Sequence, residues 1–378
     1  VVPIVPDEAR TFGMEGMFRQ LGIYTSEGQK YVPHDRVQIM YYNEDKLGVI
    51  LVEGINEAGA MSAWLALATS YSTSSRPMIP FYIFYSMFGF QRIGDLAWAS
   101  GDCQARGFLI GATAGRTTLN GEGLQHQDGH SLILANTIPN CKSYDATFGY
   151  ELTVIIQDGL KKMFEDKENY FYYLTTMNEN YTQPNMPKGC EDGIVKGLYS
   201  LRKAKLGKSK TVKVKKVVLL GAGTILNEVI AAAALLWSDF SVESDIWSLT
   251  SINELVRDGQ AVDRWNLLHP TEAPRVSYIE SQLGHITDHV VVATDYMKAY
   301  GEQLRRYINS SIHVLGTDGF GRSDSREALR HFFEVDRYFI VLSALKGLAD
   351  KGEIDKSIVV DAIQNFGIDP EKANPLYS

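Results

Sequence analysis

The chain has 378 residues, 45% of them hydrophobic and 22% charged, which is the composition of a globular protein long enough for two domains. Its formal net charge of −8 excludes a general attraction to nucleic acid, and no apolar run approaches the ~20 residues that span a membrane. Its three cysteines, Cys103, Cys141 and Cys190, fit neither a zinc site nor a disulfide framework, so we expect a reducing, cytoplasmic location. The strand-like start at Val1–Pro6, without Met, is typical of a cut through a longer polypeptide.

Strand-like and helical runs alternate along the first half of the chain, which is typical of a parallel sheet covered by helices. The pattern therefore predicts a doubly wound α/β domain. The predicted strands are Pro3–Val5, Gly48–Val52, Pro80–Tyr85, Gly107–Ala112 and Tyr170–Thr175. The predicted helices are Glu57–Tyr71, Phe90–Ser100 and Tyr150–Glu165.

The second half repeats the α/β pattern after a basic run, Arg202–Lys216. We expect this run to be a solvated linker; a docking patch for an acidic surface is the alternative. The predicted domains are residues 1–195 and 217–378, with a linker at 196–216. The predicted strands are Val217–Leu220, Ile246–Leu249, Val290–Ala293 and Ile312–Leu315, and the predicted helices are Asn227–Trp237, Arg326–Asp336, Tyr338–Lys351 and Lys356–Phe366.

Glu57 is the most informative single residue, because it falls where the strand Gly48–Val52 gives way to a helix. A carboxylate at a helix start is commonly a cap, since the first turn has free N–H donors and a positive dipole end. The alternative is a buried acid that acts on a cofactor. Local sequence leaves both interpretations open.

Two further segments combine glycine with chemically useful side chains. Ile79–Phe90 is rich in aromatic residues and runs into a glycine turn, so it is either buried core or a platform for a flat ring. Thr117–His130 is a polar loop with two histidines and two acids, which favours proton chemistry, although such histidines are often only solvated. Its spacing fits no standard metal site.

Two glycine motifs are explained by turns. Gly221–Gly223 resembles the start of a dinucleotide fingerprint, but Leu226 stands where the third small residue belongs, so a tight strand-to-helix turn is the simpler explanation. Gly316–Asp324 follows a strand and precedes a helix that Asp324 or Ser325 can cap, which indicates a structural turn.

Together these motifs resemble the carboxy-terminal part of the bacterial-type homodimeric pyruvate dehydrogenase, the thiamin diphosphate-dependent decarboxylating component of a multienzyme complex. The resemblance covers the whole chain and rests on long motifs: Pro6–Gly13, Glu53–Glu57, Gly121–His126, Asp258–Gln260, Gly316–Asp324 and Ala373–Pro375. It implies a thiamin pyrimidine-binding domain followed by a transketolase-like carboxy-terminal domain.

The resemblance also implies roles for individual positions. Glu57 matches the acid that hydrogen-bonds the aminopyrimidine ring of the cofactor and must stay protonated near neutral pH, which burial would favour. Ile55 matches the apolar residue beneath the cofactor, and Tyr85 and Phe88 match the rings packed on the pyrimidine. The other implied site residues are His126 and Glu122, which face the substrate and the lipoyl arm, and Asp7 and Glu8, near the cofactor and pyruvate.

One family motif is missing from this sequence. The family holds the cofactor's diphosphate through Mg²⁺ with a Gly-Asp-Gly motif, and Gly101-Asp102-Cys103 lacks the second glycine. We therefore expect the diphosphate-binding domain to be a separate partner, with this chain supplying the pyrimidine half of an active site in a homodimer. The other implied partners are pyruvate and a lipoyl-bearing acyltransferase, whose lipoyl group is reductively acetylated. Another transketolase-like thiamin enzyme and a non-catalytic assembly fragment are the alternatives.

Overall fold

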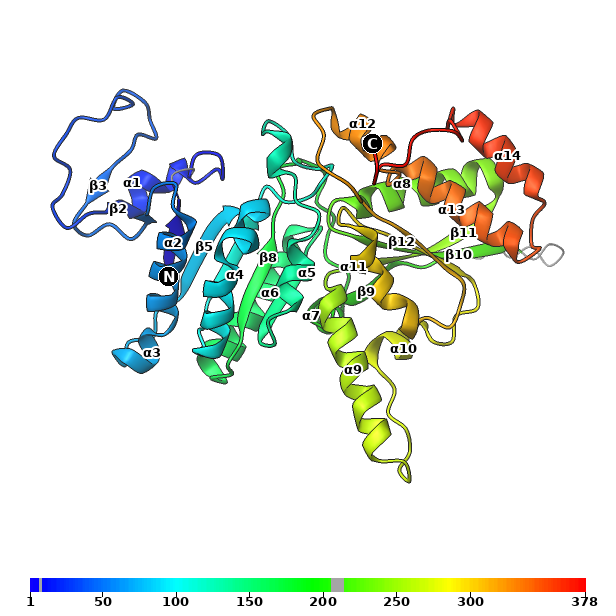
Figure 1. Cartoon of the computed structure of the whole chain (residues 1–378), viewed down its shortest axis with the longest axis horizontal. Coiled ribbons are helices and arrows are strands. Elements are labelled where there is room, and N and C mark those ends of the chain that lie inside the picture. The colour runs from blue at the N-terminus through cyan, green and yellow to red at the C-terminus, as the bar shows by residue number, and fades with distance from the viewer. Residues whose placement is uncertain (7–8, 205–213) are drawn as a thin grey trace. The chain divides into compact units, whose positions relative to one another are not determined.

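The computed structural model describes residues 1–6, 9–204 and 214–378. The chain folds into two α/β units (Figure 1). Unit 1 comprises residues 1–114, 133–143 and 157–176, and unit 2 comprises residues 115–132, 144–156 and 177–378. These units are defined by packing, so the domain boundaries that we predict along the sequence stay a prediction.

A six-stranded sheet forms the centre of unit 1, in the order β4-β1-β5-β6-β8-β7. The pairings of β1 with β4 and β5, and of β6 with β5 and β8, are all parallel. All five predicted strands are present; the sixth, β7, was missed because its sequence mixes polar and apolar residues. The bounds are β1 (Val2–Val5), β4 (Leu51–Val52), β5 (Pro80–Tyr85), β6 (Phe108–Ala112), β7 (Cys141–Asp145) and β8 (Phe171–Thr175).

Helices α2 and α4 pack on each other and on β5 in unit 1 (Figure 1). Trp64 of α2 is fully buried, and its indole nitrogen donates to the Phe108 carbonyl at 3.0 Å. The glycine turn predicted at Gly89 is wrong: α4 begins directly after β5, and Gly89 lies within the helix. A Cβ at Gly89 would lie 2.0 Å from the Phe84 ring, so glycine allows α4 to approach the strand.

The helices of unit 1, including those whose residues are divided between the two units, are short or flank the sheet. The helices are η1 (Glu15–Met17), α1 (Phe18–Leu21), α2 (Glu57–Ala68), α3 (Ser70–Thr73), α4 (Ser86–Asp102), α5 (Ser131–Asn136), α6 (Gly149–Leu160) and the π-helical η3 (Lys161–Glu165). A separate small parallel pair consists of β2 (Ile23–Tyr24) and β3 (Glu44–Asp45).

Unit 2 contains a five-stranded sheet in the order β13-β12-β10-β11-β9. Its strands are parallel except β9, which pairs antiparallel with β11 at the sheet edge. The predicted linker 196–216 therefore begins inside the sheet, because Leu198 and Tyr199 of β9 are buried; residues 205–213 lie outside the described part. The bounds are β9 (Leu198–Arg202), β10 (Lys215–Ala222), β11 (Val242–Leu249), β12 (His289–Ala293) and β13 (Ile312–Leu315).

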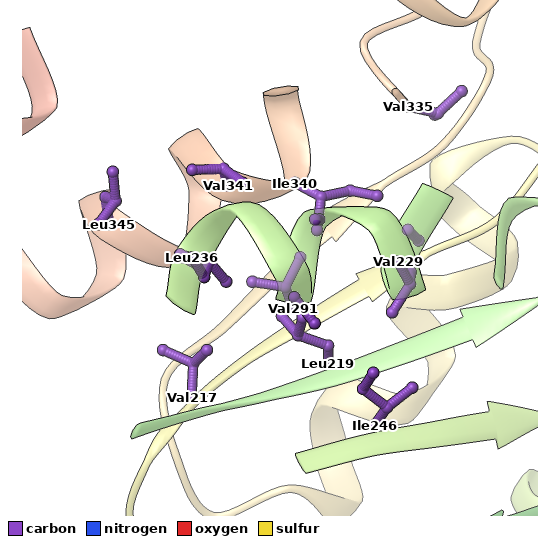
Figure 2. Packing of buried hydrophobic residues seen from close by; sticks show 14 of the residues in the cluster. Val217, Leu219, Val229, Leu236, Ile246, Val291, Val335, Ile340, Val341 and Leu345 are labelled. Carbon is purple, nitrogen blue, oxygen red and sulfur yellow. The ribbon is translucent and has the colours of Figure 1, made fainter. Parts of the chain in front are cut away.

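The core of unit 2 lies between this sheet and α8, which packs in turn against α13. Figure 2 shows Val229 and Leu236 of α8 among strand residues such as Leu219 and helix residues such as Ile340. The strand-to-helix turn predicted over Gly221–Gly223 is confirmed, since β10 ends at Ala222, Gly223 has a φ of +51° and α8 begins at Ile225. Gly221 itself lies in the strand, where a Cβ would lie 2.7 Å from the Leu226 Cα, so glycine allows α8 to approach β10.

The helices of unit 2 agree with prediction at the carboxy-terminal end, with one exception. The helix predicted over Arg326–Asp336 ends at Phe332, because the Asp336 side chain caps α13 by accepting from the backbone of Tyr338 and Phe339. Over the described ranges, no helix is long and apolar enough to cross a membrane. The helices are η2 (Leu124–His126), α7 (Glu191–Lys196), α8 (Ile225–Phe240), α9 (Ile252–Leu268), α10 (Tyr278–Leu283), α11 (Lys298–Glu302), η4 (Gln303–Tyr307), α12 (Arg326–Phe332), α13 (Arg337–Asp350) and α14 (Lys356–Asn365).

Candidate active site

Glu57 and Tyr85 stand at the same edge of the unit 1 sheet. Glu57 follows β4, and Tyr85 ends β5; both strands run parallel to β1, which lies between them. The carboxyl ends of parallel strands therefore meet here, which is where open α/β sheets bind their ligands. This edge is the candidate site.

Glu57 is the first residue of α2, but it is not the cap. Asn56 is the N-cap, and its Oδ1 accepts from the Gly59 backbone N–H at 3.0 Å. The Glu57 side chain is 14% exposed, and its Oε1 forms an ion pair with the guanidinium of Arg92 on α4. The capping interpretation is thus wrong for Glu57, whose carboxylate instead connects α2 to α4.

An aromatic cluster lies beside this ion pair. Tyr85 is buried, and its ring contacts Phe88 edge-on, with centroids 6.1 Å apart and planes at 84°. Phe12 also contacts the Tyr85 ring, with centroids 5.2 Å apart and planes at 65°. The Arg92 guanidinium carbon lies 4.1 Å from the Phe88 ring centroid. Arg92 therefore holds the candidate acid and one candidate stacking ring at the same time.

Tyr82 places a polar atom under the same site. It is fully buried in β5, and its hydroxyl has no hydrogen-bond partner among the residues that the structure describes. Burial raises the pKa of Tyr82 strongly, and the nearby charge of Glu57 raises it further. The Tyr82 phenol therefore stays neutral and places a dipole near the Glu57 carboxylate.

The other predicted site residues of unit 1 lie around the turn into α2 or outside the described part. Ile55 is 71% exposed, next to Gly54, whose φ of +72° is a conformation that favours glycine. An exposed isoleucine beside a candidate acid is available to contact a ligand. Asp7 and Glu8 lie outside the described residues.

Glu122 and His126 belong to unit 2, on the segment between Gly115 and Ser131. His126 ends the short helix η2, where its backbone N–H donates to the Gly123 carbonyl at 2.9 Å and its Nδ1 lies 3.3 Å from the same oxygen. Both side chains are half-buried. The structure thus brings Glu57, Tyr85 and Phe88 together in unit 1, and Glu122 and His126 together in unit 2.

Sequence reasoning missed Arg92, Tyr82 and Phe12. Arg92 is 35 residues from its partner Glu57, and nothing in a helical sequence marks which exposed arginine will face an acid on another helix. Tyr82 was inside the aromatic segment that we singled out, but local sequence does not show which ring lies under the acid. Within the described ranges, no cluster of three or more His, Cys, Asp or Glu could hold a metal ion.

Two family models match consecutive parts of the chain. The model described as the pyruvate dehydrogenase E1 component middle domain matches residues 1–184, and the transketolase-like C-terminal domain model matches residues 197–336. Curated relatives include the pyruvate dehydrogenase E1 components of Pseudomonas aeruginosa, 63% identical over 100% of this chain, and of Escherichia coli, 60% identical over 99%. The chain spans 42% of the length of each of these relatives.

Solved structures with the same fold are transketolases of low sequence identity. The enzyme from Leishmania mexicana has a TM-score of 0.65 at 14% identity and covers 92% of this chain and 42% of its own. The enzyme from Campylobacter jejuni has a TM-score of 0.63 at 16% identity and covers 91% of this chain and 43% of its own. A split gene transketolase, described as an inactive beta4 tetramer, has a TM-score of 0.56 at 15% identity and covers 92% of this chain and 91% of its own. The predicted transketolase-like α/β fold is confirmed.

Proposed function

We propose, on the premise that the chain belongs to the pyruvate dehydrogenase E1 component family, that it forms the pyrimidine-binding half of a thiamin diphosphate-dependent enzyme that decarboxylates pyruvate. One observation carries the proposal: an acid, Glu57, and two aromatic rings, Tyr85 and Phe88, lie at the edge of the unit 1 sheet where the parallel strands β4, β1 and β5 have their carboxyl ends. Curated relatives that match 99–100% of this chain carry the name pyruvate dehydrogenase E1 component.

The residues at this edge fit the aminopyrimidine end of thiamin diphosphate. A flat heteroaromatic ring needs an apolar surface to stack on and a polar group in its plane. Phe88 and Tyr85 provide the apolar surface, Glu57 provides the polar group, and the exposed Ile55 supplies an apolar side chain at the turn into α2. When bound, the cofactor would supply a thiazolium carbon acid, whose deprotonated form is a nucleophile for the keto carbon of pyruvate.

In this proposal Glu57 would hold a proton against the ring nitrogen of the aminopyrimidine, which would favour the imino tautomer, whose exocyclic nitrogen can act as a base. Arg92 fixes the carboxyl of Glu57 from the α4 side, and Asn56 fixes the start of α2 through its cap. Arg92 thus holds the carboxyl directly, and Asn56 holds the helix start that carries it, an arrangement that orients the acid in advance.

The substrate side of the proposal involves the residues of unit 2 and the undescribed acids. His126 and Glu122 would face pyruvate and the lipoyl group of an acyltransferase partner, which the enzyme acetylates reductively. Asp7 and Glu8 would lie near the cofactor and pyruvate. The sequence of this chain has no Gly-Asp-Gly motif, so a diphosphate-binding domain with Mg²⁺ would complete the site. The whole enzyme would be a cytoplasmic homodimer.

The test is Glu57→Ala in the full enzyme, that is, this chain together with a diphosphate-binding half. We expect the loss of nearly all pyruvate decarboxylation with an unchanged circular dichroism spectrum and melting temperature. Glu168→Gln, at an exposed acid of the same unit, is the matched control and should keep full activity. Normal turnover in Glu57→Ala would refute the assignment. Assays with branched-chain keto acids and sugar phosphates separate pyruvate from the substrates of other thiamin enzymes.

A non-catalytic assembly role is the second candidate. A solved structure of comparable extent and fold is described as the product of a split gene and as an inactive tetramer. That description favours considering a non-catalytic assembly for a chain of this length and fold. Mixing this chain with a diphosphate-binding chain distinguishes the two candidates. Restored turnover supports the catalytic half, and a stable complex without turnover supports the assembly role.

A further inference from the structure

Residues 115–131, here called the His126 loop, have buried ends and an exposed tip. Residues 115–119 and 127–129 are buried, whereas Asn120, Gly121, Leu124 and Gln125 are exposed. Glu122 and His126 thus lie on a tip whose position depends on how the two ends are held. The residues that hold these ends come from distant parts of unit 2.

Asp295, just after β12, holds the first end. Its Oδ1 accepts from the Thr117 backbone N–H at 3.0 Å and from the Thr117 hydroxyl at 2.7 Å, and its Oδ2 accepts from the Thr118 hydroxyl at 2.6 Å. Burial raises the pKa of Asp295, while Arg330 and the threonine hydroxyls oppose that shift. A buried carboxylate with three donors from one segment fixes that segment firmly.

Arg326, the first residue of α12, also binds the first end of the His126 loop. Its Nε donates to the Thr118 carbonyl at 2.6 Å, and its Nη2 donates to the carbonyl of Asn178 at 3.2 Å. Asn178 in turn donates through Nδ2 to the Asn120 carbonyl at 2.8 Å. Arg326 and Asn178 therefore bracket residues 118–120, immediately before Glu122.

The glycine-rich segment after β13 holds the second end. The Gln127 side chain donates to the Arg322 carbonyl at 2.9 Å and accepts from the Arg322 N–H at 2.8 Å, so its amide pairs with that backbone as a neighbouring strand would. A Cβ at Gly321 would lie 2.3 Å from the Leu124 carbonyl oxygen. The glycine that we attributed to a turn thus allows the backbone to pack directly against the base of the tip.

We propose that Gln127, Arg326 and Asp295 are positioning residues, through which the transketolase-like carboxy-terminal part of the chain sets the geometry of the His126 loop. The inference rests on the proposed role of His126. Gln127 is adjacent to His126 in sequence, and its two hydrogen bonds fix the residue directly after the histidine. A displacement of about 1 Å at a catalytic group can lower a rate about 100-fold.

The test uses Gln127→Met, His126→Ala and the double variant in the full enzyme. We expect Gln127→Met to lower kcat for pyruvate about tenfold or more while the apparent KM for thiamin diphosphate stays unchanged. In the His126→Ala background, Gln127→Met should change kcat less than about twofold, because residues that act through one another are not additive. Hydrogen exchange of the amides of residues 119–126 should be faster in Gln127→Met, independently of any turnover.

The controls are Gln282→Met, where the side chain donates to its neighbour Ser281, and Arg306→Met, where the arginine is 70% exposed. Wild-type exchange in Gln127→Met, or losses that multiply in the double variant, would overturn the positioning inference. Normal turnover in His126→Ala would instead overturn the proposed role of His126. If Gln127→Met does not fold, Arg326→Met is the second variant. It removes the hydrogen bond that Arg326, a partly exposed residue, donates to the Thr118 carbonyl at the other end of the loop. The expected results are the same.

Discussion

Arg92 connects the candidate acid to the candidate stacking ring, and Arg92→Met tests that connection. Methionine keeps an unbranched apolar stem but removes the guanidinium, and with it the ion pair with Glu57 and the cation–π contact with Phe88. The Arg92 side chain is 47% exposed, so the ion pair stabilises the fold by about 1 kcal/mol at most. The cation–π contact adds about 0.5–1 kcal/mol.

The expected loss of unfolding free energy in Arg92→Met is therefore only about 0.5–2 kcal/mol. The effect on the site should be larger, because Glu57 and Phe88 both lose the group that orients them. We expect the Kd for thiamin diphosphate to rise about tenfold, which is about 1.4 kcal/mol of binding free energy.

Two measurements on the full enzyme check this prediction: calorimetric titration with thiamin diphosphate and Mg²⁺, and urea denaturation. Arg106→Met is the matched control, because Arg106 also stacks on a ring, that of Tyr71 at 4.0 Å, and lies in the same unit. This control should lose at least as much stability, since Arg106 is buried, and should bind the cofactor normally. An unchanged Kd in Arg92→Met, or equal weakening in both variants, would refute the reasoning.

Two further predictions concern stability. Tyr82→Phe should leave the unfolding free energy unchanged or raise it by up to about 1 kcal/mol, because the buried hydroxyl that it removes has no partner within the described part of the chain; a clear loss in urea denaturation would show that the hydroxyl is bonded. Burial, His313 and Lys351 lower the pKa of His289 to about 4 from 6.5, so the unfolded chain takes up a proton first as the pH falls. The stability that His289 contributes is complete above pH 6.5 and is lost towards pH 4, by about 3 kcal/mol. The difference in unfolding free energy between the wild type and His289→Phe should change by that amount between pH 7 and pH 4, and parallel curves would contradict the prediction.

The fold was largely predictable because its strongest signals are local. Continuous apolar runs such as Pro80–Tyr85 and Val217–Leu220 form buried parallel strands, and the apolar helices between them cover the sheets. The helix α9 was missed because its sequence is more polar than that of a buried helix, with Ser251 as its cap. Edge strand β9 was missed because it merges into the basic run that we assigned to a linker.

The candidate site was predictable only where a residue lies at the end of an element. Glu57 and Tyr85 stand at strand-to-helix boundaries, and parallel strands bring such boundaries together. Arg92 could not be found in this way, since its contact depends on how α2 packs on α4. The same holds for Asp295, which lies 178 residues from Thr117, and for Gly321, whose role depends on the backbone of Leu124.

The account depends most on the contact between Glu57 and the aminopyrimidine ring, and proton exchange at the thiazolium carbon reports on it most directly. The measurement compares the rate at which bound thiamin diphosphate exchanges this proton for deuterium in the full enzyme and in Glu57→Gln. The account predicts that exchange slows about 100-fold or more in Glu57→Gln, the size of effect expected from loss of a positioned acid, while the cofactor still binds. Equal exchange rates in the two proteins, with the cofactor bound in both, would contradict it.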